Sequence, residues 1–326
     1  MAAVNRQVLL KARPEGIPEA EHFALAETPV PSPRDGQFLV RNRFLSVDPA
    51  MRGWVSAVAN YSRPVGLGEV VASRHPDYAV GEHVVGWLGW QEYALSDGTG
   101  IIRRVGETDL PLSAALGVLG MNGVTAYFGL LEVGEPKPGE TVVVSTAAGA
   151  VGSAVGQIAK LAGCRTIGIA GGSVKTRLCR EEFGYDAAID YKAAGDLDRE
   201  LAAACPNGVD VYFDNTSGPI SDAVLRRINK RARIVVCGTA SLSSWDPWPA
   251  GPRVERHLLV KSARMEGFLV FDYESRTAEA VAQLAAWVRA GKLRYREDIL
   301  DGIDQAPDAI AGLYRGENLG KRLIRV

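Results

Sequence analysis

The pattern of apolar and polar positions changes its period along the chain. Up to about residue 110, apolar residues occur in short runs separated by Pro and Gly, as in RQVLLKA, HFALAETPVP, DGQFLVRNRFLSVD, GEHVVGWLGWQEYALSD and TGIIRRV. Short runs bounded by turn residues are typical of β-strands. The first third of the chain is therefore predicted to be an all-β lobe, which we expect to be a small barrel.

A helical pattern follows over residues 111–131, and beyond it apolar runs alternate with helical segments. The alternation reads TVVVS, GQIAKLAG, RTIGIA, RLCREEFG, AAIDY, DLDRELAAAC, VDVYFDNTS, ISDAVLRRI and ARIVVCG. Strands that alternate with helices favour a parallel sheet wound in both directions. Residues 297–326 return to a strand, helix, strand pattern. The predicted fold class is α/β, a doubly wound parallel sheet beside a β lobe.

Composition and charge fit a globular enzyme. The 326 residues are long enough for two cores, and 37 basic against 38 acidic residues argue against nucleic acid or a membrane surface as the main partner. The N-terminus has no apolar stretch of a signal peptide, and the uncharged stretch 113–131 contains four glycines, which favours a buried helix over a membrane span. These features predict a cytoplasmic protein.

The cysteines and histidines are scattered. Cysteines occur at four positions without C-x-x-C spacing, and no cysteine lies near the first three of the four histidines. A zinc site needs such ligands in a cluster, so the sequence predicts no metal.

The most informative stretch is 141–163, TVVVSTAAGAVGSAVGQIAKLAG, where a β-branched run passes into a glycine-containing turn and then a helical pattern. Ala147, Gly149 and Gly152 stand where the dinucleotide-binding fingerprint G-x-G-x-x-G needs small residues, for a tight turn, for close approach of a pyrophosphate and for helix packing. The alternative is an ordinary strand-to-helix turn of an α/β domain.

The second strand, 165–170, indicates which dinucleotide is bound. NAD enzymes usually carry an acid at the end of this strand for the ribose hydroxyls, whereas here the chain reads GGSVKTR. Lys175 and Arg177 supply positive charge where a 2′-phosphate would lie. The sequence therefore favours NADP(H), although each cation alone could be an ordinary solvated helix residue.

Seven strings carry a resemblance that spans residues 6–326: LSVDPAMRG, GWLGWQEYALSDG, LGVLGMNGVTAYFGLL, AAGAVGSAVGQIAK, YFDNTSG, RMEGFLVFDY and ENLGKRLIRV. Together they resemble the zinc-independent medium-chain dehydrogenase/reductases, and within them the NADPH-dependent alkenal and enone reductases. The resemblance implies a GroES-like catalytic domain from residues 1–120 plus 294–326, a Rossmann NADP(H)-binding domain from 121–293, and a homodimer.

The resemblance also implies site residues. The pyrophosphate would lie on the turn and helix start, the 2′-phosphate beside a lysine and a tyrosine, and the nicotinamide beside later strand ends. In chain order the cofactor-binding residues are Gly149, Ala150, Val151, Gly152, Lys175, Tyr191, Asn215, Cys237, Gly238, Thr239, Ala240, Ser241, Phe268, Leu269, Val270 and Asn318. Read without the family, Asn215 is a turn or cap residue and Phe268 a core residue.

The implied chemistry is reduction of a carbon-carbon double bond conjugated to a carbonyl in a small electrophilic substrate. The carbonyl oxygen gains negative charge and needs a hydrogen-bond donor. Tyr61 is the candidate donor, with Tyr93 and Tyr273 as weaker ones and a loop-packing role as the alternative. Trp54, Trp245 and Trp248 are candidate lid or pocket residues, or else cover the domain junction.

The chain departs from its relatives in three places. Ala50 and Val260 replace tyrosines that are usual in the group, and the passage LGEVVASRHP after position 67 is short. The short passage indicates either a remodelled cleft or a loss of residues. Ala50 and Val260 favour, as one alternative, an NADPH-dependent quinone, carbonyl or imine reductase, and the loss of pocket donors leaves a cofactor-binding protein without turnover as another.

Overall fold

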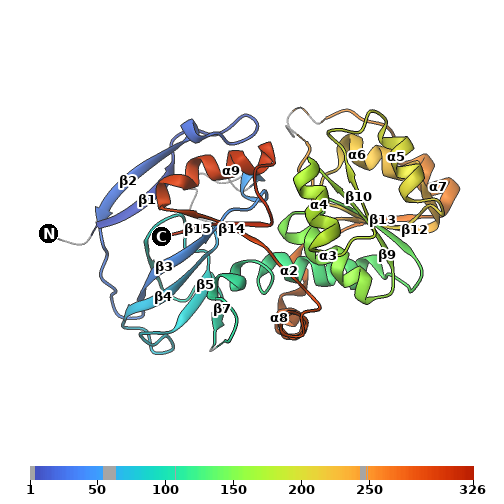
Figure 1. Ribbon diagram of the computed structural model, residues 1–326. Helices are drawn as coiled ribbons and strands as arrows, with labels where there is room; N and C mark the ends of the chain where they lie inside the picture. Colours follow the sequence, from blue (N-terminus) through green and yellow to red (C-terminus); the bar gives the residue numbers. More distant parts are fainter. Residues whose placement is uncertain (1–3, 54–63, 107, 243–246, 248) are drawn as a thin grey trace. The chain divides into compact units, whose positions relative to one another are not determined.

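The computed structural model describes residues 4–53, 64–106, 108–242, 247 and 249–326, which form two compact units (Figure 1). Unit 1 comprises Met1–Gly117 and Glu297–Val326, and unit 2 comprises Val118–Arg296. Each unit has its own sheet and its own buried clusters.

Unit 1 contains a β ribbon and a seven-stranded mixed sheet. The ribbon pairs β1 (Val4–Leu10) antiparallel with β2 (Phe23–Pro29). The sheet has the order β14-β15-β3-β4-β5-β7, and β6 also pairs with β3. Its strands are β3 (Phe38–Ser46), β4 (Gly66–Ser73), β5 (His83–Gly86), β6 (Tyr93–Ser96), β7 (Ile101–Val105), β14 (Glu297–Asp301) and β15 (Lys321–Arg325).

The predicted return of the chain to a strand, helix, strand pattern is confirmed. Strands β14 and β15 are parallel and are joined through α9 (Ala306–Arg315), and β15 pairs antiparallel with β3, Leu323 opposite Ser46. Ile310 of α9 packs with Leu45, Met51 and Trp90 in one buried cluster, so the C-terminal segment completes the core of unit 1.

Unit 2 contains a six-stranded parallel sheet in the order β10-β9-β8-β11-β12-β13. Its strands are β8 (Thr141–Ser145), β9 (Arg165–Ala170), β10 (Ala187–Asp190), β11 (Val209–Asp214), β12 (Ile228–Val236) and β13 (Arg264–Gly267). The helices are α2 (Met121–Phe128), α3 (Ala150–Leu161), α4 (Ser173–Glu181), α5 (Leu197–Ala204), α6 (Gly218–Leu225), α7 (Glu255–Lys261) and α8 (Thr277–Arg289). The predicted doubly wound sheet is confirmed.

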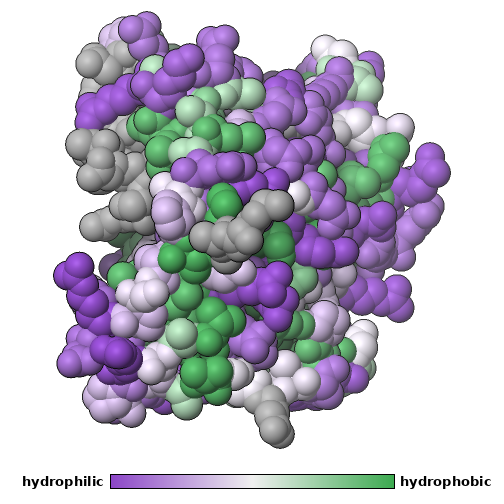
Figure 2. Space-filling view, turned by 90° about the vertical axis from the view of Figure 1, so that its left-hand side faces the viewer, coloured by the Kyte–Doolittle hydropathy of each residue, from purple (hydrophilic) through white to green (hydrophobic). Residues whose placement is uncertain are grey.

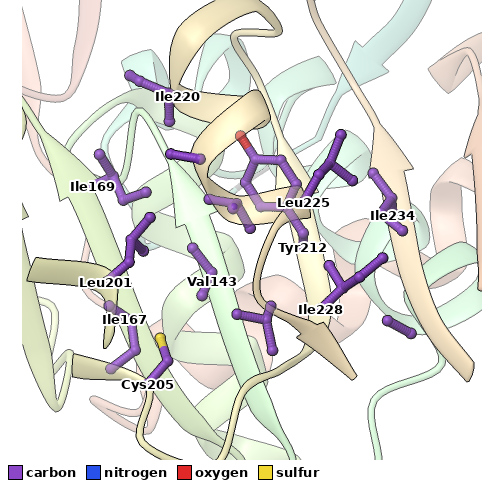
Figure 3. Close-up of a cluster of buried hydrophobic side chains, with 14 of the residues drawn as sticks. Val143, Ile167, Ile169, Leu201, Cys205, Tyr212, Ile220, Leu225, Ile228 and Ile234 are labelled. Carbon is purple, nitrogen blue, oxygen red and sulfur yellow. The ribbon is translucent and has the colours of Figure 1, made fainter. Parts of the chain in front are cut away.

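Aliphatic side chains from neighbouring strands meet helices α5 and α6 in one buried cluster of unit 2 (Figure 3). Val143 of β8, Ile167 of β9 and Ile234 of β12 are at most 1% exposed, and the ring of Tyr212 lies among them. Because both faces of a parallel sheet are covered, its strands are continuous apolar runs rather than alternating ones.

The stretch 111–131 is helical, as predicted, but it is not one helix. A 3-10 turn (Leu112–Leu116) ends at Gly117, α2 begins after Gly120, and a π-helical turn (Gly129–Gly134) follows. Gly117 and Gly120 both have non-helical backbone angles, which explains the break.

Apolar surface on unit 1 is dispersed. On the β1–β2 ribbon Val4, Leu9 and Leu25 are exposed, and Figure 2 shows apolar groups interspersed with hydrophilic ones on that side. Within the described part of the chain, every helix is too short or too polar to cross a bilayer.

Candidate functional site

The loops that follow the six parallel strands of unit 2 all leave the sheet at its carboxyl edge. From β8 the chain winds outward through β9 to β10, and from β11 it winds the opposite way through β12 to β13. The direction therefore reverses between β8 and β11. In open parallel sheets, ligands bind at such a reversal, outside the carboxyl ends of the strands.

The turn from β8 into α3 has no room for larger side chains. A Cβ on Gly152 would lie 2.3 Å from the carbonyl oxygen of Thr146, and one on Gly149 would lie 3.0 Å from the Thr146 methyl carbon. Ala147 is fully buried, and its methyl group would be 2.8 Å from a Cβ on Gly168 of β9. Each small residue of the fingerprint thus has a steric reason in the structure.

The start of α3 offers backbone donors. Gly149 is the N-cap and has no side chain, and Ala150, Val151 and Gly152 form the first turn, which contains no acidic residue. The first N–H groups of a helix have no intrahelical acceptor and lie at the positive end of its dipole. This arrangement suits an anionic phosphate group.

A second corner forms where β9 and β10 end. The Asp190 carboxylate accepts hydrogen bonds from the Gly172 N–H at 2.8 Å and the Lys192 N–H at 3.0 Å, which holds the two strand ends together. A Cβ on Gly171 would lie 3.0 Å from both the Tyr191 ring and the Lys192 Cε atom. The structure thus brings Tyr191 beside the turn that starts α4, the helix that carries Lys175 in its first turn.

Asp190 and Lys192 were missed from the sequence. Asp190 ends β10, the strand after 165–170, and Lys192 follows it by two residues, so the residues around 165–177 carry no sign of either. The signal available was their position at the end of a parallel strand, the same edge as the fingerprint turn. The Asp190 carboxylate already accepts two backbone bonds, and Lys192 adds a cation to this corner.

The loops after β11 and β12 are joined to each other and to β8. Asn215 donates from its side chain to the Ser145 carbonyl oxygen at 2.7 Å, across the point where the winding reverses. The Ser241 hydroxyl donates to the carbonyl oxygens of Thr216 at 2.7 Å and Ser217 at 2.9 Å. The predicted loop residues Cys237, Gly238, Thr239, Ala240 and Ser241 all lie in this segment directly after β12.

The segment after β13 carries Phe268, Leu269 and Val270. Phe268 packs closely on the start of the π-helical turn that follows α2, because a Cβ on Gly129 would lie 2.4 Å from the Phe268 ring. Phe268 also makes an edge contact with Tyr273 at 6.3 Å between ring centroids. Leu269 is 63% exposed. Phe268 is half-buried, so it lies at the carboxyl edge rather than in the core of unit 2.

Other candidates lie in unit 1 or outside the described residues. Asn318, between α9 and β15, donates from its side chain to the Gly320 carbonyl oxygen at 2.8 Å. Tyr61, Trp54, Trp245 and Trp248 lie outside the described residues. The two departures from the family pattern, Ala50 and Val260, are both solvent-exposed. Among the residues that the structure describes, no group of three or more His, Cys, Asp or Glu side chains could hold a metal ion.

Comparisons with known proteins agree with this arrangement. Residues 6–103 match the family model described as the N-terminal domain of oxidoreductase, and residues 150–287 match the model described as zinc-binding dehydrogenase. NADPH-dependent curcumin reductase of Escherichia coli is 44% identical, over 99% of this chain and 97% of its own length. Prostaglandin reductase 1 of Rattus norvegicus is 40% identical, over 97% of each chain.

A solved structure is similar along its whole length. CurA from Vibrio vulnificus in complex with NADPH is 43% identical and superposes with a TM-score of 0.91, over 98% of this chain and 99% of that one. Sequence and fold agree over both units. The chain belongs to the zinc-independent medium-chain dehydrogenase/reductase family, in the group of NADPH-dependent alkenal and enone reductases.

Proposed function

We propose that the protein is an NADPH-dependent oxidoreductase that reduces the carbon-carbon double bond of α,β-unsaturated aldehydes and ketones. The observation that carries the proposal is the glycine cradle between Thr146 and Gly152, set at the carboxyl edge of a parallel sheet in a chain with NADPH-dependent reductases as relatives. A Cβ at Gly152 would collide with the Thr146 carbonyl oxygen, so glycine at this position lets α3 begin close against the end of β8.

The cofactor roles of individual residues belong to the same proposal. The N–H groups of Gly149, Ala150, Val151 and Gly152 would bind the pyrophosphate, and Lys175 with Tyr191 the 2′-phosphate of the adenosine. The nicotinamide would lie beside the later strand ends. That set consists of Asn215, Cys237, Gly238, Thr239, Ala240, Ser241, Phe268, Leu269, Val270 and, from unit 1, Asn318.

When bound, NADPH supplies the hydride that adds to the β-carbon of the substrate. The chain's own task is to bind and orient both reactants and to stabilise the negative charge that grows on the carbonyl oxygen. A proton then reaches the α-carbon from a tyrosine, a ribose hydroxyl or water. Enone, NADPH and one proton thereby give the saturated carbonyl compound and NADP⁺.

Tyr61 is the proposed donor to the carbonyl oxygen. We expect Tyr61→Phe to lower kcat and kcat/KM together and to leave NADPH affinity unchanged, because the hydrogen bond strengthens only in the transition state. Loss of one such donor costs about 3 kcal/mol, less if a ribose hydroxyl replaces it. Steady-state kinetics on an accepted enone measure this. Tyr78→Phe is the control, since Tyr78 stacks on Phe38 in the β lobe. Unchanged kcat in Tyr61→Phe would mean that Tyr61 only packs.

The proposed activity is tested by NADPH consumption against enals, enones, quinones and cyclic imines, with identification of each product. We expect an enone to give its saturated ketone. Turnover with quinones or imines alone would favour a different reductase on the same scaffold. Tight NADPH binding without turnover on any electrophile would favour a cofactor-binding protein.

We also propose a cytoplasmic homodimer that associates through β13. This strand is an edge strand of the sheet in unit 2. Exposed apolar side chains precede and follow it in the sequence, namely Leu259 at 79%, Val260 at 55% and Phe271 at 47% exposure. An open, flat edge is a template for another strand. A two-fold axis at Met265 would place Arg264 opposite Glu266 of the second copy, so the edge is complementary to itself in charge.

A further inference from the structure

Asp214, the last residue of β11, is a buried carboxylate that accepts several hydrogen bonds. It is 3% exposed, and within the described ranges no Lys, Arg or His lies within ion-pair distance of it. Its Oδ1 atom accepts from the Tyr212 hydroxyl at 3.0 Å, and its Oδ2 atom accepts from the Ser221 hydroxyl at 2.5 Å. An ionised carboxylate can be buried without a cation only when several donors compensate the lost water.

The same carboxylate shapes the turn that follows it. Oδ1 accepts from the backbone N–H groups of Thr216 at 2.9 Å and Ser217 at 2.8 Å. Ser217 has a φ of 59°, a left-handed conformation that costs a non-glycine residue free energy. The two backbone hydrogen bonds to Asp214 hold the turn in this conformation.

Further bonds extend from Asp214 to both neighbouring strands. Its backbone carbonyl oxygen accepts from the N–H groups of Cys237 at 2.8 Å and Gly238 at 3.1 Å, at the end of β12. Towards β8, the Ser145 hydroxyl accepts a hydrogen bond from the Asn215 N–H at 2.8 Å and donates one to the Asp214 Oδ1 atom at 3.4 Å. One residue thus links the ends of β8, β11 and β12.

Two side chains beside Asp214 have raised pKa values. Burial, with the negative charge of Asp214 as a second cause, raises the pKa of the Cys237 thiol to about 12. The same two causes raise the pKa of the Tyr212 hydroxyl, which lies at the end of the ring shown in Figure 3. Both groups are neutral at physiological pH, so Tyr212 remains a donor to the carboxylate.

We propose that Asp214 is a positioning residue for the nicotinamide half of the cofactor: it sets the Asn215 turn and the Cys237–Ser241 loop in the arrangement that aligns the ring with the substrate. The inference rests on the proposed function. It assigns Asp214 no contact with cofactor or substrate. The adenosine half, bound at the ends of β8, β9 and β10, should not depend on this carboxylate.

The test compares Asp214→Ala with Asp210→Ala. Asp210 lies at the other end of the same strand, where its carboxylate accepts hydrogen bonds from the Thr141 N–H at 2.9 Å and the Asn229 side chain at 2.7 Å. Asp210 is therefore a second hydrogen-bonded aspartate of β11, but it lies away from the carboxyl edge of the sheet. We expect Asp214→Ala to lower kcat at least tenfold with an NADPH dissociation constant, measured by calorimetry, within threefold of the wild type. The isotope effect with 4-deuterated NADPH should rise. Asp210→Ala should lower the melting temperature and leave kcat within twofold.

Three results would overturn the inference: an Asp214→Ala kcat within threefold of the wild type, equal loss of kcat in Asp210→Ala, or NADPH affinity that falls in step with kcat. If Asp214→Ala does not fold, Asp214→Asn, which keeps the acceptor at Oδ1, and Ser145→Ala are judged by the same criteria.

If the wild type reduces no enone, the proposed function fails, and the fluorescence of bound NADPH decides the role of Asp214. Its enhancement should be lost in Asp214→Ala at unchanged affinity, and a preserved enhancement overturns the inference.

Discussion

At the scale of single residues, the corner at the start of α4 is the proposed determinant of the choice between NADPH and NADH. Lys175 lies in the first turn of α4, and Tyr191 and Lys192 pack against Gly171 in the preceding turn. These residues surround the position proposed for the 2′-phosphate, which only NADPH carries. A cation there stabilises the phosphate by a charge-assisted hydrogen bond.

We expect Lys175→Ala to remove most of the preference for NADPH over NADH. Such a contact contributes about 1.5 to 3 kcal/mol, or roughly a tenfold to hundredfold change in affinity. Calorimetric titration with each cofactor measures it. Arg180→Ala is the control, since Arg180 lies in the last turn of the same helix. Equal affinities of the wild type for both cofactors would contradict the prediction.

Gly152 allows a second residue-scale prediction. Its missing side chain lets α3 approach the Thr146 carbonyl, so Gly152→Ala should force the helix away from the strand, lower the unfolding free energy by about 1 to 3 kcal/mol and weaken NADPH binding. Thermal unfolding and calorimetry measure both. Gly195→Ala serves as the control, because a Cβ there meets nothing within 4 Å. If both variants bind NADPH as the wild type does, the cradle is not the site.

At the scale of elements, the sequence predicted those strands and turns whose formation depends on residues adjacent in the chain. The strand 165–170 and the turn at Gly149 were readable because period and turn chemistry are local signals. The break of the 111–131 helix depended on two glycines whose backbone angles are set by packing. Asp190 and Asp214 could not be singled out locally, because the contacts that link them to neighbouring strands, with Gly172 after β9 and with Ser145 of β8, join residues distant in the sequence.

Another element-scale contact ties the amino end of the sheet. Arg233 of β12 pairs with Glu140, just before β8, and donates to the Gly134 carbonyl oxygen at 2.9 Å. Burial opposes ionisation of Glu140, but the hydrogen bonds from Arg233 and from the Lys137 N–H, together with the positive charges of Arg233 and Lys137, outweigh it and lower the pKa of that carboxyl. A lowered pKa stabilises the fold above the unfolded-state value of about 4.3, and this stabilisation is lost as pH falls through the folded value.

We therefore expect Glu140→Gln to lower the unfolding free energy by about 1 to 3 kcal/mol at pH 7 and by less at pH 3. Urea unfolding at the two pH values measures the difference. In Glu200→Gln, which alters an exposed pair with Arg199 at 3.7 Å, little change is expected at either pH. A Glu140→Gln penalty that is as large at pH 3 as at pH 7 would show that charge is not its cause.

At the scale of the whole molecule, the proposed association through β13 predicts a particle of twice the 34.9 kDa chain mass. Val260→Asp and Phe271→Asp should each shift the protein to single chains, because a buried charge without a partner opposes the interface. Sedimentation equilibrium measures the mass. Leu25→Asp, on the β1–β2 ribbon, should leave it unchanged. A wild type that sediments as one chain at micromolar concentration would contradict the proposal.

The reversal of winding between β8 and β11 has a consequence for inheritance. The proposed phosphate-binding corners come from one continuous stretch, residues 141–192, and the proposed ring-aligning loops from another, residues 209–270. Two crossovers, one in the segment 135–140 before β8 and one in the segment 205–208 between α5 and β11, would exchange the first stretch and leave Tyr61 and the second stretch intact. Chimeras with relatives crossed at these two junctions should therefore acquire the donor's cofactor preference while keeping the recipient's reaction, so that the two traits can be selected separately.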